Sequence, residues 1–198
     1  MNILIAGATG ATGRHLVRDL IGRGHAVTAL VRESSDTDAL PNEVSLRHGD
    51  LTDLQAGVCD GIDVVVFAAG SGGSTGTEMT DQVDRDGAQR LIDRAGDAGV
   101  RRFVMLSSVG ADQSNPEGDL AHYLKAKHDA DEYLKASGLT HAILRPVALT
   151  NDDASGDVIL GDDVDTGAKA SRADVARLLA DAATTGQYDG MALDMQST

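Results

Sequence analysis

The sequence predicts a single α/β domain in which a doubly wound parallel sheet lies between two layers of helices, a three-layer α/β/α arrangement. Three observations carry this prediction. Short apolar runs rich in β-branched residues alternate with longer helical stretches. The first run, residues 2–6, leads straight into Gly7, as a buried parallel strand leads into a turn. The length of 198 residues suits one domain.

The elements follow in order along the chain. We expect strands at residues 2–6, 25–31, 44–48, 64–69, 102–107 and 140–145, the last stopped by Pro146. We expect helices at about 12–23, 80–98, 123–137 and 172–184, and a helical turn near 53–58. The glycine-serine stretch 70–76 follows a buried strand and is expected to be a flexible loop at the carboxyl edge of the sheet. Residues 151–167 are turn-rich and acidic.

Composition restricts the compartment and the partners. Hydrophobic residues make up 41% of the chain, and the single cysteine, Cys59, excludes an internal disulfide framework. No apolar run is long enough to cross a bilayer, so we expect a soluble, cytoplasmic protein. The formal net charge of −14 would repel phosphate backbones and anionic lipids. Neither nucleic acid nor a membrane is therefore an expected partner.

The acidic charge has an unusual make-up. The chain has 26 Asp against 5 Glu, and 13 Arg against 4 Lys. Helix propensity does not explain this bias, because Glu and Lys are the better helix formers. A dense Asp surface stays hydrated when molar salt screens its self-repulsion, with a Debye length of about 3 Å. The composition favours a salt-adapted, halophilic cytoplasm, and an ordinary acidic protein is the alternative.

Three glycines, Gly7, Gly10 and Gly13, follow the first strand and open the first helix with the spacing G-x-x-G-x-x-G. In that context the first glycine permits the sharp strand exit, the second lets backbone amides approach a pyrophosphate, and the third allows close helix-strand packing. A plain structural turn is the alternative. The motif predicts a Rossmann-type dinucleotide site.

The ends of the next two strands bear on the choice of nucleotide. Proteins that bind NAD usually have an Asp or Glu at this position, which bonds the ribose 2′-hydroxyl. This chain has Arg32 there, and an arginine can bind the 2′-phosphate of NADP, so NADP is favoured over NAD. Glu33 lies next to it and could take the acidic role, while Arg32 could be a solvated charge. Asp50 could accept a hydrogen bond from the adenine amino group while Leu51 packs on the ring, or Asp50 could be an ordinary turn residue.

Tyr123 and Lys127 are four residues apart, about one helical turn, and share one helix face. A nearby ammonium stabilises a phenolate, so Tyr123 could exchange a proton with a carbonyl or alcohol while hydride moves to or from a nicotinamide. Ser108, at the end of the strand 102–107, could hydrogen-bond the same oxygen, with Ser107 as the alternative. Such a pair also arises by chance, and Lys127 could instead pair with Asp131.

A known family is similar in six segments, residues 7–13, 30–32, 49–51, 68–70, 99–108 and 137–146. Together they resemble the atypical short-chain dehydrogenase/reductases, and more closely their compact NAD(P)H-binding branch, which includes sugar-epimerase-like, NmrA-like and flavin reductase-like proteins. The resemblance runs from Met1 to about Ala182 and is specific to the superfamily rather than to a substrate. It matches Ser108, Tyr123 and Lys127 to the catalytic triad, with Lys127 also orienting the nicotinamide ribose. Relatives usually have glycine after the proline, whereas this chain has Val147. The cofactor-binding residues expected from the motifs and the resemblance are Gly7, Thr9, Gly10, Ala11, Thr12, Gly13, Arg32, Asp50, Leu51, Ala68, Ala69, Gly70, Ser107, Lys127, Pro146 and Val147.

Three histidines and the cysteine give weaker indications of a functional role. His122, His128 and His141 lack metal-ligand spacing and are expected at the surface, and we expect no metal. Cys59 is expected to be a small apolar core residue rather than a nucleophile.

The sequence therefore predicts an NADP(H)-dependent oxidoreductase for a small carbonyl or alcohol, as a monomer or homodimer with a small substrate-side cap drawn from residues 147–198. A redox-sensing NAD(P)H-binding regulator without turnover and an NAD-dependent epimerase/dehydratase-like enzyme are the alternatives. The short stretch after Pro146 leaves little room for the substrate domain of an extended epimerase.

Overall fold

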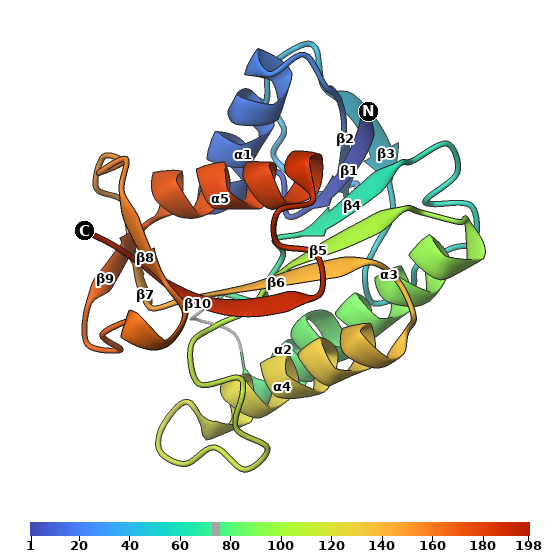
Figure 1. Ribbon diagram of the computed structural model, residues 1–198. Coiled ribbons are helices and arrows are strands. Elements are labelled where there is room, and N and C mark those ends of the chain that lie inside the picture. Colours follow the sequence, from blue (N-terminus) through green and yellow to red (C-terminus); the bar gives the residue numbers. More distant parts are fainter. Residues whose placement is uncertain (73–75) are drawn as a thin grey trace.

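The computed structural model describes residues 1–72 and 76–198, so the predicted loop 70–76 lies partly outside the described residues. Within them, an eight-stranded sheet has the order β3-β2-β1-β4-β5-β6-β10-β8 (Figure 1). Its strands are β3 (Ser45–His48), β2 (Ala26–Val31), β1 (Asn2–Ala6), β4 (Val64–Phe67), β5 (Arg102–Leu106), β6 (His141–Pro146), β10 (Met191–Ser197) and β8 (Val158–Leu160). All pairings are parallel except that of β10 with β8. The sequence-based prediction of a doubly wound, Rossmann-type sheet is confirmed.

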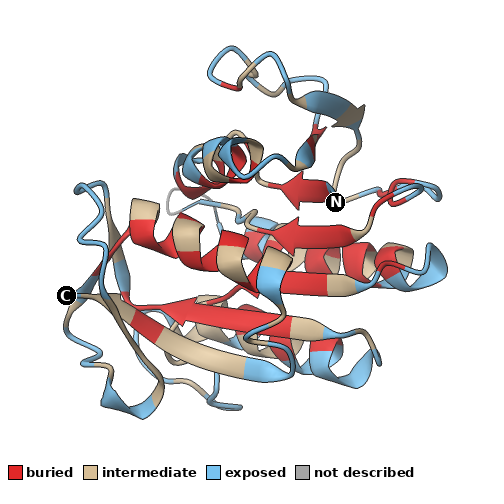
Figure 2. Cartoon of the chain, turned by 45° about the horizontal axis from the view of Figure 1, so that its top comes forward, coloured by how far each residue is buried: buried red, intermediate tan, exposed pale blue. Residues whose placement is uncertain are grey.

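Helices cover both faces of the sheet (Figure 1). One face carries α1 (Ala11–Gly22) and α5 (Arg172–Thr185). The other carries α2 (Thr77–Thr80), a π-helical turn η1 (Asp81–Arg85), α3 (Asp86–Asp97) and α4 (Ala121–Ala136). Each layer has its own apolar core, and the central strands are buried from both sides (Figure 2). The uninterrupted run Val64–Phe67 is fully buried because both of its faces meet helices.

Two of the predicted helical segments differ from the structure. Residues 53–58 contain no helix: Asp53 forms an isolated bridge with Asp50, and residues 56–58 lie in a turn. The helix predicted at 80–98 begins earlier, at Thr77, and is interrupted by η1, whose backbone hydrogen bonds span one residue more than those of an α-helix. Apolar periodicity cannot locate such an insertion, because the residues on either side remain helical.

The last quarter of the chain holds strands that the sequence did not predict. After Pro146, β7 (Ala148–Thr150) pairs with β9 (Lys169–Ser171) in a separate two-stranded sheet, and a short 3-10 helix η2 (Gly161–Asp163) follows β8. Strand β10 then returns to the main sheet beside β6. Its side chains are mostly half-buried, and Asp194 and Gln196 interrupt the apolar pattern. Among the described residues, no helix is both long and apolar enough to cross a bilayer.

Candidate functional site

The glycine loop between β1 and α1 needs glycine at two positions for steric reasons. Gly7 has φ +90°, and a Cβ there would lie 2.6 Å from the Ala68 carbonyl carbon in the neighbouring strand exit. A Cβ on Gly13 would lie 2.0 Å from the Gly7 carbonyl oxygen. Gly10 caps α1, and its amide donates to the same Gly7 oxygen over 3.0 Å. The loop therefore holds the amino end of α1 against the carboxyl edge of the sheet, where a helix favours an anion.

A pocket of about 500 Å³ opens in front of this loop. Its walls come from the ends of β1, β2, β3 and β4 and from the segment that includes α2 and η1. Nine predicted cofactor-binding residues line it: Gly7, Thr9, Gly10, Arg32, Asp50, Leu51, Ala68, Ala69 and Gly70. Sequence reasoning did not name Leu30, Ser35, Thr52, Ser71, Met79, Gln82 or Val83, which also line it. Ala11, Thr12 and Gly13 lie in the first turn of α1, whereas Ser107, Lys127, Pro146 and Val147 are not among the lining residues.

Arg32 lies at the pocket rim, directly after β2, and its backbone amide donates to Ser35 Oγ over 3.0 Å. Glu33, the alternative ribose ligand, is instead 3.1 Å from His48 Nδ1. The Asp50 carboxylate accepts hydrogen bonds from the Thr52 amide and hydroxyl, both over 2.8 Å. These bonds lower the pKa of Asp50, so the pocket holds a firmly ionised carboxylate beside Leu51.

Tyr123 and Lys127 lie on the first turns of α4, next to the ends of β4 and β5. The Lys127 ammonium is 5.7 Å from the centre of the Tyr123 ring and 5.9 Å from that of Phe67. It lies 3.4 Å from the Leu106 carbonyl oxygen and 3.1 Å from Asp84 Oδ1. Burial alone would lower the pKa of Lys127, but Tyr123, Asp84 and Asp131 outweigh it and raise it above the ordinary value. Lys127 is therefore a buried ammonium beside the Tyr123 ring.

The two serines after β5 have different surroundings. Ser107 is buried, and its hydroxyl donates to Asp131 Oδ2 over 2.9 Å. The half-buried Ser108 donates only to the adjacent Val109 carbonyl, over 3.3 Å. A hydroxyl in a long contact with its own neighbour can reorient toward a ligand more readily than one held by a buried carboxylate. The geometry favours Ser108 over Ser107 as a group that meets a substrate.

Asp84 is the residue of this region that sequence reasoning missed. It lies in η1, is almost fully buried, and accepts a hydrogen bond from the Ser71 amide over 2.9 Å as well as pairing with Lys127. An Asp in a predicted helix ordinarily indicates a solvated face. Asp84 nevertheless lies four residues before Ala88 and seven before Leu91, so it continues the buried face of α3, and this helical spacing is the signal that could have located it.

The remaining candidate residues fit structural roles. Burial raises the pKa of Cys59 to about 12, as expected for a core residue rather than a nucleophile. His122 pairs with Asp81 at 3.0 Å, while His128 and His141 bond backbone carbonyls. All three are at least partly exposed.

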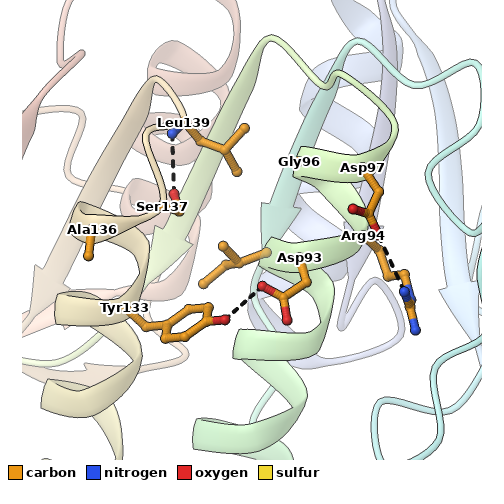
Figure 3. Close-up of a pocket in the computed structure, with 9 residues that line it drawn as sticks. Asp93, Arg94, Gly96, Asp97, Tyr133, Ala136, Ser137 and Leu139 are labelled. Carbon is orange, nitrogen blue, oxygen red and sulfur yellow. Dashed lines mark hydrogen bonds and ion pairs between the residues drawn. The ribbon is translucent and has the colours of Figure 1, made fainter.

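A second hollow of about 600 Å³ lies between the carboxyl ends of α3 and α4 (Figure 3). The Tyr133 hydroxyl donates to Asp93 Oδ1 over 2.8 Å across it, and Arg94 pairs with Asp97 at its margin. It is lined by Ile92, Asp93, Arg94, Gly96, Asp97, Tyr133, Ala136, Ser137 and Leu139. The carboxyl ends of these helices lie at the opposite edge of the sheet from the glycine loop, so this hollow is separate from the candidate site.

A glycine loop at the amino end of α1, facing a pocket at the carboxyl edge of a parallel sheet, defines a dinucleotide-binding protein of the Rossmann type. The chain belongs to the NAD(P)H-binding family, whose model matches residues 7–185.

Three similar proteins place the chain within that family. It is 38% identical over 185 residues to the uncharacterized sugar epimerase YhfK of Bacillus subtilis, covering 89% of this chain and 85% of that protein. A candidate NAD-dependent epimerase/dehydratase from Bacillus halodurans has a solved structure with a TM-score of 0.93 and 32% identity, covering 100% of this chain and 94% of the other. The ceramide reductase of Caulobacter vibrioides is 32% identical over 150 residues, covering 74% of this chain and 46% of that protein. The family thus includes proteins named as reductases and as epimerases.

Proposed function

We propose that this chain is an NADP(H)-dependent oxidoreductase that interconverts a small carbonyl compound and its alcohol. The observation that carries the proposal is the Lys127 ammonium beside the Tyr123 ring, at the sheet edge where the nucleotide pocket opens. A phenol near a buried positive charge is suited to proton transfer, and a nucleotide pocket supplies the place for the hydride carrier.

The residues of the pocket fit a dinucleotide. Gly7 and Gly10 line the pocket and carry no side chain, so their backbone is open to the approach of a pyrophosphate. Arg32 and Ser35 line the rim of the pocket, where their guanidinium and hydroxyl groups could bind an adenosine 2′-phosphate. Glu33, the alternative ligand for a free 2′-hydroxyl, lies 3.1 Å from His48 Nδ1 in an exposed contact, so the proposed preference for NADP(H) over NAD(H) rests on Arg32.

The proposed chemistry is a balanced hydride and proton transfer. A nucleotide held by the glycine loop and Arg32 would supply the hydride for the carbonyl carbon. The Tyr123 phenol donates its proton to the carbonyl oxygen, and the Lys127 ammonium stabilises the phenolate that remains. The Ser108 hydroxyl hydrogen-bonds the same oxygen and polarises the carbonyl. In the reverse direction, Tyr123 accepts the alcohol proton.

After Pro146 the chain contributes short elements to the substrate side: β7, β8 and β9 within residues 147–171, followed by α5 and β10. We propose that parts of this segment form a cap over a compact substrate.

The test is calorimetric titration of the folded chain with NADPH and with NADH in molar potassium chloride, so that a fold requiring salt is intact. We expect NADPH to bind at least tenfold more tightly, a difference of about 1.4 kcal/mol. A folded sample that binds neither nucleotide would contradict the proposal. Circular dichroism of the same sample establishes that it is folded.

A second candidate is a redox-sensing regulator that binds the nucleotide without turnover. The observation that favours it is the buried pairing of Lys127 with Asp84, which engages the ammonium that an oxidoreductase uses at the nicotinamide ribose. The Tyr123→Phe variant separates the two functions. If the protein is an enzyme, the variant loses the wild type's turnover of a panel of small carbonyls and keeps its NADPH affinity. If the protein is a regulator, neither the wild type nor the variant shows turnover.

A further inference from the structure

Asp84 and Lys127 form an ion pair that is almost completely removed from water. Their side chains are 0% and 4% exposed, and Lys127 Nζ lies 3.1 Å from Asp84 Oδ1. Transferring two charges out of water is costly, and their attraction offsets this only where the geometry is favourable. An apolar pair of similar size would fill the same space without that cost. A role for the charges themselves is therefore the natural explanation.

Neighbouring groups on three sides fix the position of the Lys127 ammonium. Phe67 from β4 and Tyr123 from α4 present ring faces to it, and the Leu106 carbonyl from β5 accepts a long hydrogen bond. Asp84, from η1, supplies the ion-pair partner. A protonated lysine in this position needs a counterion, and Asp84 is the carboxylate in direct contact with it.

The other carboxylate oxygen of Asp84 bonds a residue of the pocket wall. Oδ2 accepts the Ser71 amide hydrogen over 2.9 Å, and a Cβ on Gly70 would lie 3.2 Å from Oδ1. Gly70 and Ser71 line the pocket, as do Gln82 and Val83, the two residues before Asp84. One side chain therefore joins the pocket wall to the lysine beside Tyr123.

Charged groups reach this lysine from three elements. Asp84 comes from η1 and Tyr123 and Asp131 come from α4, and each favours the charged form of Lys127. Arg145, at the end of β6, pairs with Asp131 at 3.0 Å and balances its charge. The neighbours from β4 and β5, Phe67 and the Leu106 carbonyl, carry no charge. Removing the Asp84 charge leaves a net positive environment around Tyr123 and Lys127.

We propose that Asp84 is a positioning residue of this site. Its Oδ1 atom holds the Lys127 ammonium beside the Tyr123 ring, and its Oδ2 atom ties that ammonium to the pocket wall at Ser71. The negative charge of Asp84 offsets part of the positive charge of Lys127. The Tyr123 phenol therefore releases its proton less readily than it would beside Lys127 alone. The functional meaning of this arrangement rests on the proposed function, because it presumes that Tyr123 exchanges a proton with a substrate.

The test measures proton release directly and needs neither substrate nor nucleotide. The chain has three tyrosines, so tyrosine labelled with carbon-13 at Cζ gives three resonances to follow by NMR as the pH is raised. Lysine labelled at Cε reports Lys127 in parallel. In Asp84→Asn we expect the first proton lost from the Tyr123–Lys127 pair to leave about one pH unit lower, a tenfold change in acidity. Tyr133 and Tyr188 should titrate as in the wild type.

The matched control is Asp86→Asn, which removes the same charge from the start of α3, where Asp86 pairs with Arg85. It should leave the Tyr123–Lys127 titration in place. Unchanged titration in folded Asp84→Asn, or an equal shift in both variants, would overturn the proposal. A structural role alone would lower the melting temperature without moving the titration.

A second comparison keeps the proposal testable if Asp84→Asn does not fold. Lys127→Met removes the buried ammonium, so the double variant Asp84→Asn/Lys127→Met has no uncompensated charge in this pair. We expect the Tyr123 resonance to titrate at lower pH in the double variant than in Lys127→Met alone. Equal titration in the two would contradict the influence of Asp84 on the phenol. Because nothing here depends on turnover, a protein that fails as an oxidoreductase can still pass this test.

Discussion

Arg145 and Asp131 form a buried ion pair between β6 and α4, with Arg145 Nε 3.0 Å from Asp131 Oδ2. The same oxygen accepts the Ser107 hydroxyl hydrogen over 2.9 Å. In the part of the chain that the structure describes, Asp131 Oδ1 and Arg145 Nη2 have no hydrogen-bond partner. Burial raises the pKa of Asp131, against the opposing effects of Arg145 and Ser107. Burial of this pair therefore disfavours the ionised carboxylate of Asp131, and Arg145 and Ser107 favour it.

The Asp131→Asn variant should be strongly destabilised, because it leaves the Arg145 guanidinium buried without a counterion. We expect a loss of about 3–5 kcal/mol in the free energy of unfolding, measured by urea denaturation. The control Asp129→Asn breaks the more exposed pair with Lys125 on the same helix and should cost about 0.3–0.5 kcal/mol. Similar losses in the two variants would show that burial of the pair contributes nothing.

Replacing Arg32 by Ala should weaken NADPH binding and leave NADH binding nearly unchanged, because only NADPH carries the 2′-phosphate. We expect at least a tenfold loss for NADPH, about 1.4 kcal/mol, by calorimetry. Arg18→Ala removes the same charge from an exposed position on α1 and is the control for general electrostatics. Equal losses for both nucleotides in Arg32→Ala would assign the residue to another part of the cofactor.

Gly13→Ala should damage both the fold and the nucleotide site, since its Cβ would lie 2.0 Å from the Gly7 carbonyl oxygen. Displacing that loop should cost about 1–3 kcal/mol and abolish measurable NADPH binding. Gly22→Ala is the control, because a Cβ there meets nothing within 4 Å at the other end of α1. It should be neutral or stabilising by about 0.5–1 kcal/mol. Normal NADPH binding by Gly13→Ala would contradict the assigned loop geometry.

Asp174 gives the structure an acid-sensitive contact. Burial alone would raise its pKa, but hydrogen bonds from the Ser197 hydroxyl, the Ser155 amide and hydroxyl and the Gly156 amide lower it. A lowered pKa in the folded state stabilises the fold at neutral pH, and this stabilisation is lost as the pH falls from about 4 through the folded-state value. Asp174→Asn should therefore melt at a lower temperature than the wild type at neutral pH.

That difference between Asp174→Asn and the wild type should shrink in scanning calorimetry as the pH is lowered below about 4. The exposed Asp153→Asn variant should show no such pH-dependent difference. A constant gap between Asp174→Asn and the wild type across the acid range would mean that the lost hydrogen bonds are insensitive to ionisation.

The net charge of −14 predicts that salt stabilises the fold. Screening shortens the Debye length from about 10 Å at 0.1 M to about 3 Å at 1 M and reduces repulsion among the carboxylates. The melting temperature should rise with potassium chloride over this range. A triple variant of exposed positions, Asp38→Asn/Asp153→Asn/Asp163→Asn, should show a weaker dependence on salt. A flat response in the wild type would favour an ordinary acidic protein over a halophilic one.

The parts of the fold that could be predicted are those with a strong local signal. Strand β4 reads Val-Val-Val-Phe and is buried on both faces, so its apolar run predicts it directly. Strand β10 could not be predicted in this way, because its half-buried positions admit Asp194 and Gln196. Its place beside β6 depends on long-range pairing, which no local pattern encodes.

The same distinction between local and long-range features applies to the residues of the candidate site. The glycine loop was predictable because its spacing and its place between a strand and a helix are both local features. Asp84 was not predicted, because an Asp in a helix usually faces solvent, although its spacing to Ala88 and Leu91 places it on the buried face. Its pairing with Lys127, from a helix some forty positions further along the chain, is a long-range contact that no local pattern encodes. The assignments of Ser108, Tyr123 and Lys127 as catalytic residues remain predictions.

Strands β6 and β10 are neighbours in the sheet although residues 147–190 separate them along the chain. The excursion that contains β7, β8 and β9 runs from Pro146 to α5 at Arg172, where the Ser171 hydroxyl accepts the Ala173 amide hydrogen. Within it, β8 returns to the main sheet as the edge strand beside β10, and Ser155 and Gly156 donate to Asp174. Insertions and deletions there can alter one rim of the molecule while every central strand keeps its partners. The scaffold is suited to diversification by exchange of a single segment.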